Sequence, residues 1–178
     1  MHIIQNLHIT GGLGNGTIVG GSGNDTIIDN YGSNTIDGGA GDDIIIANGL
    51  DLPMWAAGNT INGGDGNDYI EGSNVKDKLS GGNGYDVIYG LGGNDEIHGG
   101  AGNDYLDGGK GNDRLYGGTG DDLLIGASGH DTISGDENTR PWVLTIPALS
   151  PIPICSPKTE CANCWASSTA MSINSALR

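Results

Sequence analysis

Isoleucine or leucine recurs every nine residues along most of the chain. The series runs over five positions from Ile9 to Ile45 and resumes over nine positions from Ile61 to Ile133. A period of nine is neither the 3.6 residues of a helix nor the 2 residues of a strand. Self-similarity at a fixed period indicates a repeat architecture, so the repeat unit is interpreted before any single residue.

Polar positions follow the same period. Numbered from its first glycine, the repeat has mostly glycine at positions 1, 2 and 4, an Asp or Asn at position 6 and the apolar residue at position 8. The stretch GGAGNDYLDGGKGNDRLYGG (99–118) contains the repeat twice. Position 6 holds Asp25, Asn34, Asp43 and Asn59, and then the aspartates Asp68, Asp77, Asp86, Asp95, Asp104, Asp113, Asp122 and Asp131.

Nine residues can build half of one coil of a solenoid. Glycine permits backbone angles closed to other residues, so positions 1 to 6 can form a compact turn. Positions 7 to 9 then form a very short strand whose middle residue points inward. Two repeats complete a coil, and repeats n and n+2 stack about 4.8 Å apart. We therefore expect an all-β parallel β-roll, a β-helix-like solenoid with two short-stranded parallel sheets, followed by an irregular C-terminal tail.

The chain divides into four segments. We expect a first block of the roll with an N-terminal cap at 1–46, an interrupting loop at 47–57, a second and better-formed block at 58–138, and a Pro-rich tail at 139–178. Asp43 and Asp68 are 25 residues apart, two fewer than three whole repeats, which indicates a loop that leaves the repeat and returns. The tail is expected to be extended or disordered. It fits a linker, a degenerate secretion signal or sequence from a shifted reading frame.

Composition excludes several classes of protein. The chain has 35 Gly, no Phe and a net charge of −15. Few aromatic residues and a high charge are typical of disorder, but a disordered chain needs no apolar residue every nine positions. Collagen would need glycine at every third position. The negative charge argues against nucleic acid as a partner, and no apolar run is long enough to predict a membrane span.

The aspartates of position 6 predict a cation site. Stacking places Asp68, Asp86, Asp104 and Asp122 along one edge of the roll, and Asp77, Asp95, Asp113 and Asp131 along the other. Carboxylates about 5 Å apart repel one another by about 1 kcal/mol even in water. Ca²⁺ takes six to eight oxygen ligands, whereas Mg²⁺ tends to keep its waters. Zinc is disfavoured because the repeats contain no Cys and only scattered His.

The pattern GGxGxDxUx resembles the calcium-binding nonapeptide repeats of RTX (hemolysin-type) proteins over about residues 11–138. The resemblance implies a parallel β-roll, calcium ligation by position-6 aspartates with turn carbonyls, and secretion by a bacterial type I apparatus. Pairing repeats n and n+2 predicts about six or seven ions. Asn34, Asn59 and the turn GSNVKD (72–77) depart from the pattern, so we expect weak or absent sites there. The implied ligands are Asp25, Asp43, Asp68, Asp77, Asp86, Asp95, Asp104, Asp113, Asp122 and Asp131.

No catalytic constellation is found in the sequence. The phosphate-loop, HExxH and GxSxG motifs are absent, and Ser128 near His130 belongs to an ordinary repeat turn. The four histidines have no metal-ligand spacing, and CANC (161–164) with Cys155 lacks a fourth ligand. We therefore expect that this chain is not an enzyme by itself.

The resulting hypothesis is a secreted, extracellular module whose folding is driven by Ca²⁺. Each coil buries only two apolar side chains, which stabilise less than ordering eighteen residues costs, so binding and folding are expected to be one event. The start MHIIQNLHIT has no basic region and no apolar core, so no N-terminal signal peptide is expected. Two alternatives stay open: the C-terminal repeat region of a larger extracellular enzyme (protease, lipase or polysaccharide epimerase type), or an adhesin or surface-layer spacer. A polysaccharide or cell-surface partner is left open with them.

Overall fold

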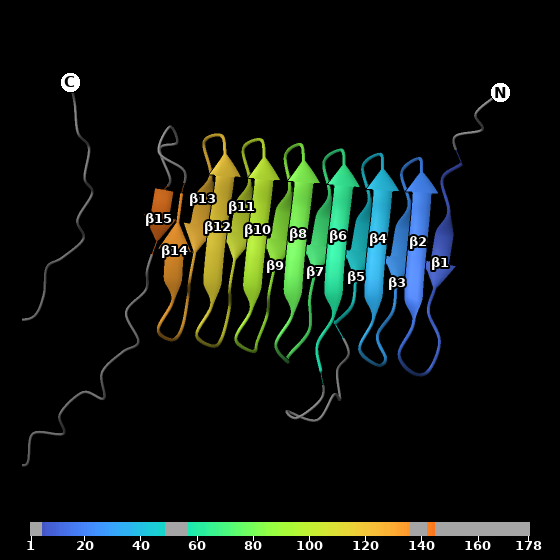
Figure 1. The fold of residues 1–178 in the computed structure, drawn as a ribbon, viewed down its shortest axis with the longest axis horizontal. Helices are drawn as coiled ribbons and strands as arrows, with labels where there is room; N and C mark the ends of the chain where they lie inside the picture. Colours follow the sequence, from blue (N-terminus) through green and yellow to red (C-terminus); the bar gives the residue numbers. More distant parts are fainter. Residues whose placement is uncertain (1–4, 49–56, 136–141, 145–178) are drawn as a thin grey trace, which may run out of the picture. The chain divides into compact units, whose positions relative to one another are not determined.

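The structure, a computed structural model, describes residues 5–48 and 57–135 and the backbone of residues 142–144. All regular structure in these residues is β-strand, and consecutive strands alternate between two parallel sheets (Figure 1). The predicted all-β parallel roll is confirmed. Most of the predicted loop at 47–57 and of the predicted tail at 139–178 lies outside the described residues.

The first sheet is built from three-residue strands. Its order follows the sequence, each strand pairing with the strand one coil before and one coil after it. The strands are β1 (His8–Thr10), β3 (Thr26–Ile28), β5 (Ile44–Ile46), β7 (Tyr69–Glu71), β9 (Val87–Tyr89), β11 (Tyr105–Asp107), β13 (Leu123–Ile125) and β15 (Trp142–Leu144).

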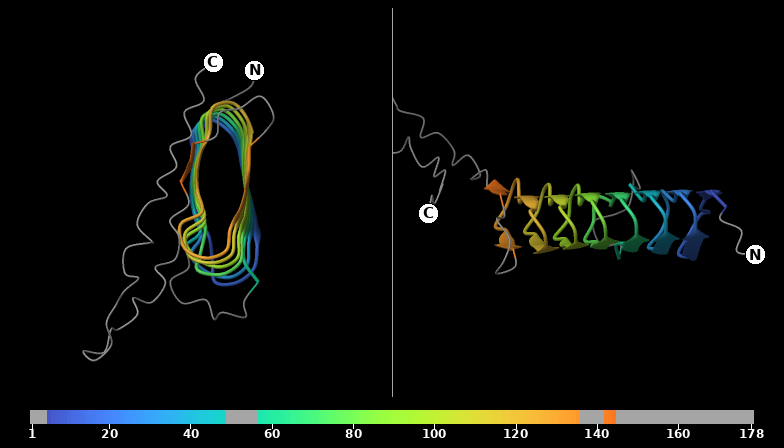
Figure 2. Two further views of the ribbon diagram at one scale, coloured as in Figure 1. Left: turned by 90° about the vertical axis from the view of Figure 1, so that its left-hand side faces the viewer. Right: turned by 90° about the horizontal axis from the view of Figure 1, so that it is seen from above.

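The second sheet contains longer strands and faces the first across the interior (Figure 2). Its strands are β2 (Thr17–Ser22), β4 (Thr35–Ala40), β6 (Thr60–Asp65), β8 (Lys78–Asn83), β10 (Glu96–Ala101), β12 (Arg114–Thr119) and β14 (Thr132–Ser134). The register confirms the stacking of repeats n and n+2, since Ile97 pairs with both Leu79 and Leu115.

Strand length in the second sheet differs from the prediction. Strands of three residues were expected throughout, but β2, β4, β6, β8, β10 and β12 each continue for six residues through the Gly-Gly pair. Gly100 pairs with Gly82 and Gly118 in this extension. Its φ of +121° is open to glycine, and an added Cβ would collide with the Gly82 carbonyl oxygen. The glycines of this sheet therefore belong to strand as well as turn.

The interior is a single stack of position-8 side chains. They lie between the two sheets as predicted, and those of the central coils are completely or almost completely buried. Ile9, Ile18 and Ile133 lie near the two ends of the stack and are only partly buried. The buried members are Ile27, Ile36, Ile45, Ile61, Ile70, Leu79, Ile88, Ile97, Leu106, Leu115 and Leu124.

The two predicted blocks share continuous sheets. Strand β4 pairs with β6 and β5 pairs with β7, so the coils on either side of the insertion are direct neighbours. The backbone N–H of Asp43 donates to Asp68 Oδ1 at 2.8 Å, and these two residues are 25 positions apart. The next bond of the same kind, from the N–H of Asp68 to Asp86 Oδ1, joins residues 18 positions apart. The interpretation that two residues are missing from three repeats is therefore wrong. One coil instead carries seven additional residues.

Candidate metal-binding sites

Position 6 forms two columns, one along each edge of the roll. The first column lies where the chain passes from a six-residue strand of the second sheet to a three-residue strand of the first sheet, and the second column lies where it returns. The first column contains Asp25, Asp43, Asp68, Asp86, Asp104 and Asp122. The second contains Asn34, Asn59, Asp77, Asp95, Asp113 and Asp131.

One oxygen of each column member serves the backbone. The Oδ1 atom of Asp104 accepts the N–H of Asp86 at 2.9 Å, and the same bond joins Asp113 Oδ1 to the N–H of Asp95 at 2.8 Å. Asparagine does this equally well, because Asn59 Oδ1 accepts the N–H of Asn34 at 2.8 Å. Oδ1 therefore holds neighbouring coils in register whether position 6 is Asp or Asn.

The second carboxylate oxygen is buried without a hydrogen-bond partner in most turns. A buried polar atom without a partner is costly, and a carboxylate oxygen more so, which makes each of these atoms a candidate ligand for a missing group. The unpartnered Oδ2 atoms are those of Asp25, Asp43, Asp68, Asp86 and Asp104 in the first column, and of Asp95 and Asp113 in the second.

A second oxygen faces the same space from the next coil. An added Cβ at Gly90 would lie 2.6 Å from Asp95 Oδ2 and 2.7 Å from the carbonyl oxygen of Gly108. In the first column, a Cβ added at Gly99 would likewise lie against Asp104 Oδ2 and the carbonyl oxygen of Gly117. The missing side chain of position 1 thus leaves room where a carboxylate and a carbonyl converge. Oxygen ligands of this kind suit a hard cation such as Ca²⁺.

Side chains alone do not complete such a site. Over residues 5–48 and 57–135, no three side chains of Asp, Glu, His or Cys gather closely enough to hold a metal ion. The ligand set would therefore depend on backbone carbonyl oxygens of the turns. This suits Ca²⁺, which accepts carbonyl oxygens, and argues against Zn²⁺, which prefers nitrogen and sulfur.

Burial raises the pKa of the column carboxyls. It brings the pKa of Asp95 to about 8, of Asp68 and Asp104 to about 7, and of Asp113 to about 6. In each case the loss of hydration is the largest cause, the backbone hydrogen bond opposes it, and neighbouring aspartates raise the pKa further. Burial thus shifts each of these carboxyls toward its protonated form, and a nearby positive charge would lower the pKa again.

In three turns of the second column, the polar atoms of the position-6 side chain are all hydrogen-bonded within the protein. Asp77 Oδ2 accepts the N–H of Ser73 at 2.6 Å and its hydroxyl at 2.9 Å. Asn34 Nδ2 donates to the carbonyl of Tyr31, and Asn59 Nδ2 donates to the carbonyl of Ala47. Asp131, which is half-buried near the end of the column, accepts the N–H of Asp113 at 3.0 Å.

Position 5 carries a hydrogen-bond ladder that the sequence interpretation missed. The N–H of Asp42 donates to Asn24 Oδ1 at 3.1 Å, and the N–H of Asn67 donates to Asp42 Oδ1 at 2.8 Å. In the second edge, Asn112 donates likewise to Asn94 Oδ1. These oxygens accept from the following coil, whereas the position-6 oxygens accept from the preceding one. The recurrence of Asn or Asp before the position-6 residue is the signal that could have revealed it.

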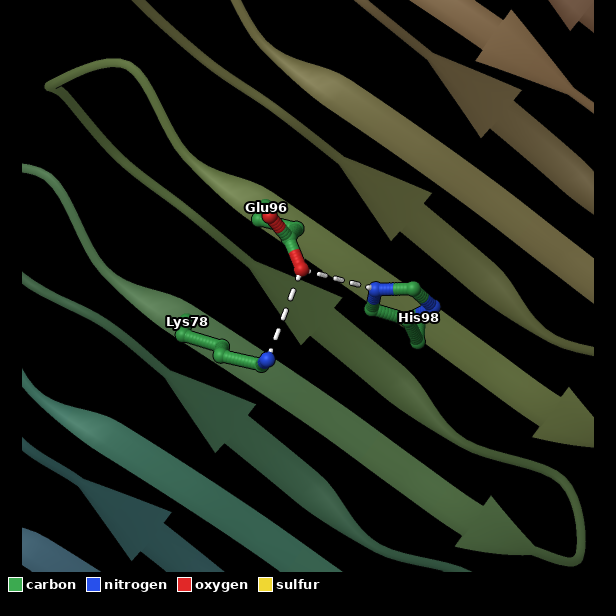
Figure 3. Close-up of polar contacts among 3 residues, drawn as sticks. All are labelled: Lys78, Glu96 and His98. Carbon is green, nitrogen blue, oxygen red and sulfur yellow. Dashed lines mark hydrogen bonds and ion pairs between the residues drawn. The ribbon is translucent and has the colours of Figure 1, made fainter.

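The exposed face of the second sheet carries a small charged cluster that lies outside the turns. Lys78 Nζ on β8 lies 3.5 Å from Glu96 Oε1 on β10, and His98 Nε2 lies 3.3 Å from the same oxygen (Figure 3). The hydrogen bond with His98 is the largest cause that lowers the pKa of Glu96. His98 also stacks on Tyr116, with ring centroids 4.6 Å apart. The His98 side chain is partly exposed and belongs to this cross-strand cluster.

The fold and its turns define a parallel β-roll with oxygen-rich turns suited to a cation. A family model of the RTX calcium-binding nonapeptide repeat matches the chain in four copies, at residues 9–49, 56–84, 71–106 and 107–138. The chain therefore belongs to this family and carries an RTX-type calcium-binding module. No curated protein matches the chain. Among the described residues, no helix is long and apolar enough to cross a membrane.

Proposed function

We propose that the module binds Ca²⁺ between consecutive coils, with Oδ2 of a position-6 aspartate and the position-1 carbonyl of the next coil among the ligands. The observation that carries the proposal is the series of buried Oδ2 atoms without a partner. When bound, Ca²⁺ supplies positive charge and accepts several oxygens at once. Asp122 and Asp131 complete the two columns by register. The seven unpartnered oxygens support an expected count of six or seven ions.

Calcium binding and folding are coupled in this proposal. The interior holds one layer of Ile and Leu, and the turns on both sides of it bury carboxylates. Charged carboxylates that lose their hydration without a partner oppose the folded state. A cation between coils removes that penalty only in the folded chain, so it stabilises the fold by mass action.

The proposed setting is extracellular and bacterial. RTX repeats are typical of secreted bacterial proteins, and a chain that folds only at high calcium suits export through a type I apparatus in an unfolded state. We propose that the segment has no catalysis of its own. The hypotheses of a larger extracellular enzyme and of an adhesin or surface-layer spacer concern sequence beyond this segment, and the neighbouring sequence of the gene distinguishes them.

A calcium titration tests the coupling. The protein is dialysed into EGTA, titrated with Ca²⁺ and followed by far-ultraviolet circular dichroism, while calorimetry counts the ions; Mg²⁺ titrated in parallel is the control. We expect a disordered spectrum in EGTA, a cooperative gain of β structure with Ca²⁺, and no comparable gain with Mg²⁺. A folded β spectrum in EGTA that Ca²⁺ leaves unchanged contradicts the coupling, and a calorimetric count of zero contradicts calcium binding itself.

A further inference from the structure

The second column divides into two parts of different chemistry. Asp95 and Asp113 bury Oδ2 without a partner, whereas Asn34, Asn59 and Asp77 have every side-chain polar atom hydrogen-bonded within the protein. We propose that the turns ending at Asn34, Asn59 and Asp77, here called the hydrogen-bonded segment, bind no calcium, because the chain's own side chains replace the ion. This inference rests on the proposed calcium binding of the other turns.

Ser73 replaces the ion at Asp77. Its hydroxyl lies 2.9 Å from Asp77 Oδ2 and 3.1 Å from Oδ1, and its N–H lies 2.6 Å from Oδ2. Ser73 is completely buried, as is nearly all of Val75. The carboxylate therefore receives from two donors of Ser73 the compensation that a cation would supply in the other turns.

The backbone of this turn follows a different path from the regular turns. In the turn that ends at Asp113, Gly109 and Gly111 at positions 2 and 4 have φ of +87° and +138°. Ser73 and Val75 occupy the same positions, and neither has a positive φ. Side chains disfavour positive φ, although Leu91 adopts it (φ +72°) at position 2 of the turn that ends at Asp95, so the loss of glycine at position 4 is what sets the Ser73 turn apart.

The two asparagines exclude an ion in another way. Their Oδ1 atoms keep the ladder bond, and their amide groups donate to the carbonyls of Tyr31 (2.9 Å) and Ala47 (3.3 Å). A neutral amide that points its hydrogens at a carbonyl presents a donor where a cation would need an acceptor.

Position 1 of these two coils also lacks the open space. Asp29 and Ala47, both buried, stand where the regular turns have glycine, so a Cβ occupies the place that Gly90 leaves free in the second column. The two asparagine turns are thus closed by their position-1 side chains as well as by their position-6 side chains, whereas the turn that ends at Asp77 keeps glycine, Gly72, at position 1.

The calcium ions are therefore distributed unevenly along the roll. The N-terminal coils hold ions along the first column only, while the coils from Asp95 onward hold them along both columns. Folding of the C-terminal coils therefore depends more steeply on calcium concentration. The N-terminal coils keep one edge in register through hydrogen bonds that calcium does not affect.

Ion counting on the whole chain tests the inference. Native mass spectrometry at saturating Ca²⁺ compares wild type, Ser73→Ala, and Asp113→Asn as the matched position-6 variant in the same column. A fourth variant, Ser73→Gly with Val75→Gly, restores glycine at positions 2 and 4. We expect the wild-type count for Ser73→Ala, at least one ion fewer for Asp113→Asn, and one ion more for the double variant, whose folding is checked by circular dichroism.

The outcomes separate this inference from the proposed function. A wild-type protein that binds no calcium contradicts the proposed function itself. A wild-type protein that binds calcium, together with a Ser73→Ala variant that loses an ion, overturns the inference alone, as does a folded double variant without an additional ion. If the double variant does not fold, the counts of Ser73→Ala and of Asn59→Ala decide, since both must equal the wild-type count.

Discussion

At the scale of the residue, the two oxygens of a position-6 aspartate have separate tasks. Oδ1 accepts a backbone N–H from the preceding coil, and in seven turns Oδ2 lacks a hydrogen-bond partner and is the proposed calcium ligand. Asparagine preserves the first task, and in place of Oδ2 it presents an amide group, which in Asn34 and Asn59 donates to a carbonyl. An Asp→Asn change in a regular turn therefore isolates the contribution of the metal from that of the ladder.

Asp104→Asn tests this separation. The variant keeps the acceptor for the Asp86 N–H and loses the charge and the Oδ2 ligand. We expect the calcium midpoint for folding to rise at least about tenfold, about 1.4 kcal/mol of binding free energy, together with a lower ion count. The control is Asp121→Asn, which removes the same charge from an exposed position-5 residue. Equal midpoints for the two variants would show that Asp104 is not a ligand.

Gly99→Ala tests the space at position 1. The new methyl group would collide with Asp104 Oδ2 and with the carbonyl oxygen of Gly117, the two oxygens proposed to face the ion. We expect a loss of about 1–3 kcal/mol in the stability of the calcium-loaded fold, measured by urea unfolding in saturating Ca²⁺. Gly12→Ala is the matched control, because an added Cβ there meets nothing within 4 Å. A Gly99→Ala variant as stable as Gly12→Ala would argue against a crowded ligand space.

Periodicity alone predicted which residues form the interior, and it predicted the two columns from Asp68 to Asp131. A position-8 residue must point inward and a position-6 residue must end a turn, so their places follow from counting. The contacts of Ser73 do not follow from counting, since they depend on a local backbone path in which positions 2 and 4 lack the positive φ of the regular turns. The position-5 ladder was also missed, because an Asn or Asp in a glycine-rich turn has many possible partners.

At the scale of the element, the inserted residues do not shift the register of the sheets. The coil that carries seven additional residues still pairs β4 with β6 and β5 with β7 without a shift. The sequence predicted a loop here, but the spacing of 25 residues was assigned to the wrong number of repeats. Distance along the chain could not reveal that the extra residues belong to one coil, whereas the hydrogen bond from Asp43 to Asp68 does.

Deletion of residues 50–56 tests whether the insertion separates the two blocks. The deletion restores the usual spacing of 18 residues between Asp43 and Asp68. Because both sheets already run across this coil, we expect one cooperative calcium transition, as in wild type, with a midpoint within about twofold, since loop length changes closure entropy only slowly. Calcium titrations of both proteins by circular dichroism provide the measurement. Two separate transitions in wild type that merge in the deletion variant would show that the blocks fold independently.

At the scale of the whole molecule, negative charge accumulates along the roll. The chain carries a net charge of −15, and buried carboxylates recur along both edges. A thin interior of one apolar side chain per repeat gives each coil little stability of its own. Under the proposed coupling, the folded state depends on positive charge supplied to the turns, and both calcium and protons can supply it.

Proton concentration should therefore replace part of the calcium requirement. The pKa of Asp95 in the fold is about 8 and that of Asp104 about 7, against about 4 for an aspartate in an unfolded chain. A raised pKa means that the folded state binds more protons, so this contribution to stability is present below about pH 4 and is lost as pH rises through 7 to 8.

In EGTA, we expect the folded fraction to increase as pH falls from 8 to 5. In calcium, protons compete for the same oxygens, so the number of protons released per ion bound should increase over the same range. Calorimetry in buffers of different ionisation enthalpy measures that release, and Asp104→Asn should reduce it. A folded fraction in EGTA that stays constant between pH 8 and 5 would contradict the coupling of protons to the fold.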